Sequence, residues 1–214
     1  MCAEANAYFH SDAVQTMGHC LHDMRSLHVS GMAASAHKFY GPKGIGFLYM
    51  RKDKKINPFV LGGSQERNMR GGTENTYGII GIAKALEIAY RDMARQEKHI
   101  QMLKKEMIDK LRAQIPGVDF HGDSANLDKS LAKVLNVSLP ESEENDLLLF
   151  NLDLSGISAS GGSACSSGAS TGSHVLQALY PESKRGAIRF SFSKYNTLEE
   201  INFAVGKLAS FFAV

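Results

Sequence analysis

The feature that most constrains the fold is a long helical pattern in the middle of the chain. Apolar residues recur there every three or four positions in two runs. The first run is Ile79, Ala83, Leu86 and Ala89, and the second is Ile100, Leu103, Met107 and Leu111. The pattern runs from Tyr77 to Ala113, which is long for one globular helix, so we expect a break or kink near Arg95. The segment then bridges two lobes, residues 1–95 and 96–214.

Strand patterns occur on both sides of this segment. The stretch "AYFHSDAVQ" (7–15) predicts a strand with an acidic residue at its exit, and "GIGFLYMR" (44–51) predicts another. Together they indicate alternating α/β structure. Beyond Pro116 the pattern predicts a small α+β domain, with strands at 118–121, 134–139 and 187–193 and helices at 143–150, 174–180 and 198–212.

Composition excludes several classes of function. The 24 Lys and Arg residues nearly balance the 22 Asp and Glu residues without a basic block, which argues against a nucleic-acid partner. No stretch approaches the roughly 20 apolar residues that span a bilayer, so we expect no membrane partner. The three cysteines suit neither a disulfide framework nor a metal site. We expect a cytoplasmic protein without a bound metal.

Lys38 is the first candidate for chemistry. It lies in "SAHKFYGPKGIGFLY" (35–49) with His37 beside it, small residues before it and glycines after it. A lysine forms a Schiff base only as the free amine, which burial and nearby positive charge favour. The alternative is that the following Gly-Pro-Lys-Gly (41–44) is simply a turn and Lys38 a surface cation, and the lysine alone favours that alternative because most lysines are exposed.

Asp12 strengthens the case for a cofactor. It follows the apolar run from Ala7 to Phe9, and ligands of α/β sheets bind at the carboxyl ends of the strands. Pyridoxal 5′-phosphate (PLP) needs a carboxylate that keeps its ring nitrogen protonated, so Asp12 and Lys38 together would supply both groups that PLP requires. Spacing leaves one alternative equally open, which is that Asp12 is the N-cap of a helix opening "AVQTMGH".

Two further residues are candidates in the second lobe. Cys165 lies in "GGSACSSG", where glycines and small hydroxyl residues predict a mobile loop that could deliver a thiol to a site; the alternative is an incidental exposed cysteine. In "AIRFSFS" the period-two alternation places Arg189 opposite Ile188 and Phe190. Its guanidinium suits a substrate carboxylate, and a salt bridge at the rim is an equal alternative. Residues 62–76, rich in glycine, are a weak candidate for a phosphate-binding loop.

Taken together, these motifs resemble the NifS-like cysteine desulfurases, a family of class V PLP-dependent aminotransferases. The matching stretches are, in order, "HSDAVQ", "SAHKFYGPKGIGFLY", "GGSQERNMRGGTEN", "GSACSSG", "SHVL" and "IRFSFSKYNTLEE". The resemblance begins at about Ala3 and corresponds to the C-terminal portion of the family. It implies the C-terminal part of a PLP-binding large domain, with an interdomain helix, followed by a small α+β domain that carries the cysteine loop.

The resemblance assigns most site residues to the cofactor. Lys38 would bond PLP covalently, Asp12 would pair with the pyridine nitrogen, and Gln15 would contact the phenolic oxygen. Ser35 and His37 would contact the phosphate, and His37 is also a catalytic candidate.

The remaining assignments concern the substrate and a partner subunit. Thr73 would reach the phosphate of the other subunit in a homodimer, and Arg189 would bind the carboxylate of L-cysteine. Cys165 would collect the sulfur as a persulfide while alanine is released, and would pass it to an acceptor or scaffold protein for iron-sulfur cluster or related cofactor assembly. Two alternatives stay open: a non-catalytic remnant that acts as a sulfur carrier or docking module, and another class V aminotransferase or lyase.

Overall fold

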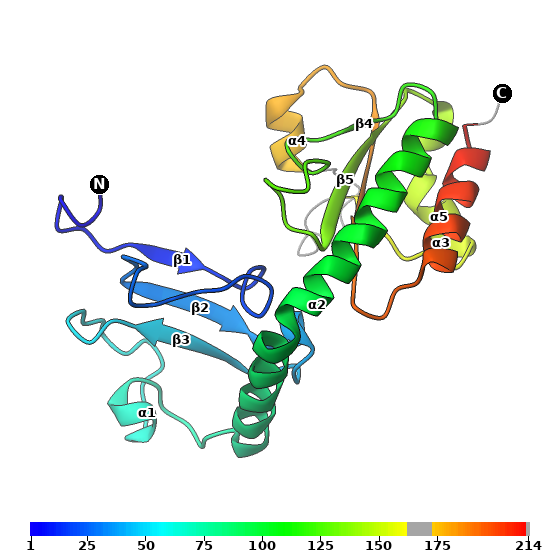
Figure 1. Ribbon diagram of the computed structural model, residues 1–214. Helices are drawn as coiled ribbons and strands as arrows, with labels where there is room; N and C mark the ends of the chain where they lie inside the picture. The colour runs from blue at the N-terminus through cyan, green and yellow to red at the C-terminus, as the bar shows by residue number, and fades with distance from the viewer. Residues whose placement is uncertain (162–172, 213–214) are drawn as a thin grey trace. The chain divides into compact units, whose positions relative to one another are not determined.

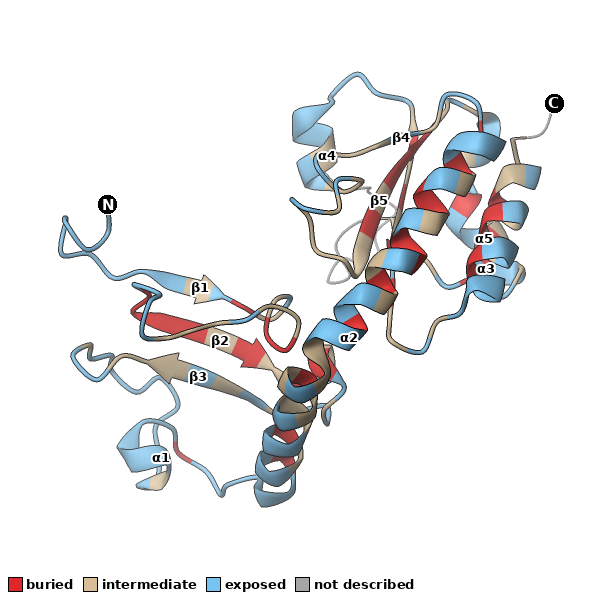
Figure 2. Ribbon diagram, in the orientation of Figure 1, coloured by how far each residue is buried: buried red, intermediate tan, exposed pale blue. Residues whose placement is uncertain are grey.

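The computed structural model describes residues 1–161 and 173–212, and they form two compact units, residues 1–94 and 95–214 (Figure 1). Each unit has its own three-stranded sheet and its own cluster of buried apolar side chains. Figure 2 shows burial concentrated in the central strand of each sheet and along stripes of the long helix. Because each unit has a separate core, the two are described in turn.

The first unit is built on a small mixed sheet. Its elements are β1 (His10–Asp12), β2 (Gly31–Ser35), the 3₁₀ turn η1 (Ala36–Phe39), β3 (Gly46–Met50) and α1 (Gln65–Asn68). The strand order is β1-β2-β3, with β1 parallel and β3 antiparallel to β2. Since β1 and β2 are parallel, their carboxyl ends lie at the same edge of the sheet. Asp12 pairs there with Ala33.

The core of this unit includes one stripe of the long helix α2 (Thr76–Gln114). Ile82 and Ala89 are buried, and Ala85 and Leu86 pack against the same cluster. Of the apolar residues in the helical pattern, Ile79 and Ala83 are exposed. The buried stripe begins at Ile82 and follows the i, i+3, i+4, i+7 spacing of one helix face.

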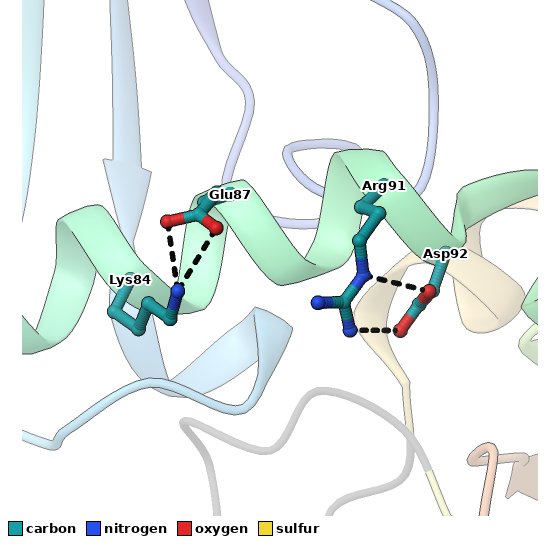
Figure 3. Close-up of polar contacts among 4 residues, drawn as sticks. All are labelled: Lys84, Glu87, Arg91 and Asp92. Carbon is teal, nitrogen blue, oxygen red and sulfur yellow. Dashed lines mark hydrogen bonds and ion pairs between the residues drawn. The ribbon is translucent and has the colours of Figure 1, made fainter.

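The exposed face of the same segment carries short-range ion pairs. Figure 3 shows Lys84 Nζ donating to both carboxylate oxygens of Glu87, at 2.9 and 3.0 Å, and Arg91 pairing with Asp92 at 2.9 Å. Exposed pairs of this kind contribute little to stability, on the order of a few tenths of a kcal/mol each. These ion pairs lie on the solvent-exposed face of α2.

The expected break near Arg95 is absent, because α2 is one helix of 39 residues. Its sequence explains this continuity, since no proline occurs anywhere in it and no glycine occurs after Gly81. Strong helix formers such as alanine, lysine, glutamate and methionine fill that stretch. The change from one unit to the other therefore occurs inside an unbroken helix.

The second unit is a small α+β domain. Its antiparallel sheet has the order β4 (Asp119–Phe120), β5 (Val134–Leu139), β6 (Gly186–Ser191), and its helical elements are η2 (Glu143–Asp146), α3 (Leu148–Leu154), α4 (His174–Leu179) and α5 (Leu198–Ser210). The C-terminal half of α2 supplies Leu103, Met107 and Leu111 to its core. The helix predicted at 143–150 is divided, because Leu147 lies outside helical geometry between η2 and α3.

Two features of the described residues bear on what the chain binds. Among residues 1–161 and 173–212, no helix combines the length and apolar character that a membrane span needs. Within the same ranges, no group of three or more His, Cys, Asp and Glu side chains is placed to hold a metal ion.

Candidate functional site

Asp12 lies at the carboxyl end of β1, where its side chain is exposed. Its carboxylate Oδ1 accepts a hydrogen bond from the amide of Val14 at 2.9 Å, and the following residues form hydrogen-bonded turns. The helix that the N-cap alternative required is therefore not present after Asp12. The residue begins a loop and holds a carboxylate at the sheet edge where ligands of α/β folds bind.

Lys38 lies in the turn that directly follows β2. Ala36 and Phe39 of η1 are buried and hold the turn to the core, while His37 is exposed and Lys38 is partly exposed. The turn is closed by hydrogen bonds from Gly41 N to Ala36 O at 2.9 Å and from Ala36 N to Ile45 O at 3.1 Å. Across the described ranges, no hydrogen bond or ion pair engages Lys38 Nζ. The Lys38 amine therefore belongs to a hydrogen-bonded turn, and within the described ranges no other side chain occupies it.

The sheet brings these two residues to one edge. Asp12 ends β1, and Lys38 follows the end of the adjacent parallel strand by three residues. PLP requires a carboxylate for its protonated ring nitrogen and an amine for its aldehyde carbon. The two residues supply this pair of groups, so the chemistry of the donor set fits PLP.

The other cofactor candidates lie on nearby segments of the same unit. Ser35 is the N-cap residue of η1 and its hydroxyl makes no capping bond, while Gln15 in the loop after β1 is exposed. Thr73 is exposed in the coil between α1 and α2. It follows three consecutive residues with positive φ, Glu66 to Asn68. The roles of these residues remain predictions.

Arg189 lies in the second unit on β6. Its backbone bonds Ser160 on one side, with Arg189 N to Ser160 O at 2.6 Å, and it pairs with Asn136 of β5. Ile188 and Phe190 are buried, so the predicted alternation is confirmed. The Arg189 Nε atom is buried without a hydrogen-bond partner, and no salt bridge within the described ranges contains the residue. The rim salt bridge is thus not observed, and the guanidinium retains a donor for an anionic ligand.

Cys165 lies outside the described residues, so its role remains a prediction from the sequence. His19 is a residue that no sequence motif singles out. Its Nε2 atom lies 2.9 Å from the carbonyl oxygen of Lys38. No local pattern would have indicated this contact, because it joins a loop to a turn nineteen positions later in the chain.

Comparison with known proteins places this site in a family. The aminotransferase class-V family matches residues 1–203. "Cysteine desulfurase IscS" of Dictyoglomus turgidum is 43% identical over 207 residues, covering 96% of this chain and 52% of that protein. "Putative cysteine desulfurase IscS 1" of Bacillus subtilis is 39% identical, covering 96% of this chain and 54% of that protein. The chain thus spans about half the length of the curated relatives it matches.

Solved structures agree with the sequence comparison. A "NIFS-LIKE PROTEIN" superposes with a TM-score of 0.83 at 35% identity, covering 97% of this chain and 53% of that chain. A NifS-like protein from Rickettsia africae gives a TM-score of 0.86 at 26% identity, covering all of this chain and 56% of that one. The fold of the chain thus matches part of the α/β fold of these proteins. The chain belongs to the aminotransferase class-V family, and the resemblance to NifS-like cysteine desulfurases is confirmed.

Proposed function

We propose that this chain forms the lysine-bearing and cysteine-bearing part of a PLP-dependent cysteine desulfurase. The observation that carries the proposal is the position of Lys38 on a rigid turn beyond β2, one parallel strand away from the carboxylate of Asp12. PLP, when bound, would supply an electron sink that weakens the carbon-sulfur bond of the substrate. The relatives named as cysteine desulfurases support L-cysteine as that substrate.

Each residue would have a defined task. Asp12 would hold a proton on the ring nitrogen by charge attraction, and Lys38 would place its amine at the reacting carbon and carry a proton to and from it. The guanidinium of Arg189 would hold the substrate carboxylate. Cys165 would accept the sulfur, and the overall change is balanced without an external oxidant: L-cysteine and the Cys165 thiol give L-alanine and a Cys165 persulfide.

The wider biological context is part of the same proposal. The persulfide sulfur would pass to an acceptor protein for iron-sulfur cluster or related cofactor assembly, in the cytoplasm. A homodimer, with Thr73 reaching the partner's phosphate site, is supported by exposed apolar side chains near that segment. They include Phe59, which is 97% exposed, and Leu61, which is 81% exposed. Such side chains mark association surfaces when they gather on one region.

The test is turnover of L-cysteine by the purified chain with added PLP. We expect alanine and sulfide from the unaltered chain in the presence of a thiol reductant. Lys38→Ala should form neither product, because the amine is lost. Cys165→Ala should retain the absorption band of lysine-bound PLP and lose persulfide formation.

Three results would redirect the proposal. Turnover that survives Lys38→Ala would remove the lysine from the mechanism. Turnover that Cys165→Ala leaves unchanged would favour another lyase or aminotransferase of the family. Absence of turnover in the unaltered chain, together with transfer of sulfur from a persulfide donor onto Cys165, would favour the carrier or docking module.

A further inference from the structure

The loop between β1 and β2 carries three histidines, and two of them, His19 and His22, make different contacts. His19 Nε2 lies 2.9 Å from the carbonyl oxygen of Lys38, whereas His22 Nε2 lies 3.1 Å from the hydroxyl of Thr16 in its own loop. A carbonyl oxygen only accepts hydrogen bonds, so His19 must carry a proton on Nε2 and donate it to Lys38. The first contact therefore fixes the tautomer of His19 and joins the loop to the lysine turn.

The Lys38 carbonyl is an end group of a short helical turn. The last carbonyls of such a turn have no partner inside it, and the closing amides of Tyr40 and Gly41 both donate to Ala36 O instead. His19 therefore supplies the donor that the turn itself does not provide. Tyr40 adopts φ +68°, which is uncommon for a residue with a side chain and costs about 1 kcal/mol or more. External contacts must hold that conformation.

Gly18, the residue next to His19, packs closely against the same turn. Gly18 has φ +76°, and a Cβ atom there would lie 2.6 Å from Phe39 Cβ. The ring of His19 also meets the ring of Tyr40 in an edge-to-face arrangement at 6.4 Å. The Gly18–His19 pair thus contacts Lys38, Phe39 and Tyr40 in succession, and the loop that makes these contacts begins at Asp12.

We propose that His19 is a positioning residue for Lys38. By donating a hydrogen bond to the Lys38 carbonyl, His19 fixes the backbone that carries the Lys38 amine. The same bond joins this backbone to the loop that follows Asp12, the residue proposed to pair with the ring nitrogen. The inference rests on the proposed function for the task of the amine. The hydrogen bond itself joins two residues of the first unit and does not depend on the proposed function.

Three variants separate this role from general stability. His19→Phe keeps an aromatic ring beside Tyr40 and removes the donor, whereas His19→Gln keeps an N–H at a similar reach. His22→Phe is the matched control, because it alters a histidine of the same loop that contacts Thr16. Circular dichroism checks that each variant is folded.

The first readout needs no cofactor. The backbone carbonyl ¹³C resonance of Lys38, measured in the labelled full chain, reports the hydrogen bond directly. We expect it to shift in His19→Phe and to stay near its original position in His19→Gln and His22→Phe. An unchanged resonance in His19→Phe, or an equal shift in His22→Phe, would overturn the hydrogen bond as the positioning contact.

The second readout is the yield of PLP trapped by borohydride on Lys38, relative to exposed Lys43 in the same molecule. Loss of one hydrogen bond should lower this ratio about fivefold in His19→Phe, with rescue in His19→Gln. An undiminished ratio in His19→Phe would overturn the positioning role while leaving the proposed function intact. Absence of Lys38 label in the unaltered chain, with the carbonyl shift present, would instead overturn the proposed function and confirm only the hydrogen bond.

Discussion

Lys104 shows how one residue sets a pH dependence outside the candidate site. Its side chain is fully buried on α2, where Nζ donates to Ser130 Oγ at 2.7 Å and to Leu131 O at 3.0 Å. Burial without a carboxylate among these partners lowers the pKa of Lys104 from 10.5 to about 8. Lys104 lies on the helix face of the buried Ile100, Leu103 and Met107, whereas the neighbouring Lys105 is exposed.

The first prediction follows from that pKa. Between pH 8 and 10.5 the unfolded chain binds more protons at Lys104 than the folded chain, so the free energy of unfolding should rise with pH across this window. The full effect is on the order of 3 kcal/mol. Lys104→Met should flatten the rise. Urea unfolding at several pH values measures it, with exposed Lys98→Met as control. An identical pH profile in Lys104→Met would contradict the assignment.

At the scale of elements, α5 is defined by a reciprocal cap. Thr197 Oγ1 accepts from Glu200 N at 3.3 Å, and a Glu200 carboxylate oxygen accepts from Thr197 N at 3.1 Å. These bonds satisfy two amides that a helix start leaves unpaired. The pKa of the Glu200 carboxyl is lowered, chiefly by the hydrogen bond that Asn196 Nδ2 donates to it and secondly by the one from Thr197 N. The cap orients the face that buries Ile201 and Val205.

The second prediction concerns this cap. Thr197→Ala should lower the free energy of unfolding by about 1 kcal/mol, because the Glu200 amide loses its acceptor. Thr197→Ser keeps the hydroxyl and should retain most of the stability. Urea unfolding of the full chain gives both values. A loss in Thr197→Ser equal to that in Thr197→Ala would show that the methyl packing, and not the cap, carries the effect.

Elements with strong local patterns were predictable from sequence, and contacts through loops were not. The alternation around Arg189 predicted β6 because its apolar side chains do face the core. The predicted break near Arg95 failed because length alone does not end a helix that lacks glycine and proline there. Asp12 and Lys38 were predicted as site residues from residue chemistry and resemblance, and their roles stay predictions. The contact of His19 with the Lys38 turn was not predicted, because its partner is a backbone oxygen and no pattern of side chains indicates such a partner.

Across the whole chain, central and edge strands differ in how well they are protected. In the second unit β5 lies between β4 and β6, and its residues Leu135, Val137 and Leu139 are fully buried. In the first unit β1 is a three-residue edge strand, with His10 and Asp12 exposed. Nearby Tyr8 and Phe9 are exposed as well. Edge strands with little cover open locally at low cost.

The third prediction is a difference in hydrogen exchange between β5, a central strand, and β1, an edge strand. Amides of β5 that bond to β6 should exchange slowest, by global unfolding of their unit, because their strands are buried and paired. Amides of the β1 segment should exchange much faster, by local opening. Exchange measured by mass spectrometry on the full chain compares them in one experiment. Equal protection of both strands would contradict this ranking.

The central claim is that Lys38 is the residue that bonds PLP. The most direct test is to add PLP to the purified chain, reduce with borohydride and map the modified peptides by mass spectrometry. We expect the reduced cofactor on Lys38 in clear preference to Lys43, an exposed lysine of the same loop. Cofactor on Lys43 or other exposed lysines, with Lys38 unmodified, would contradict it.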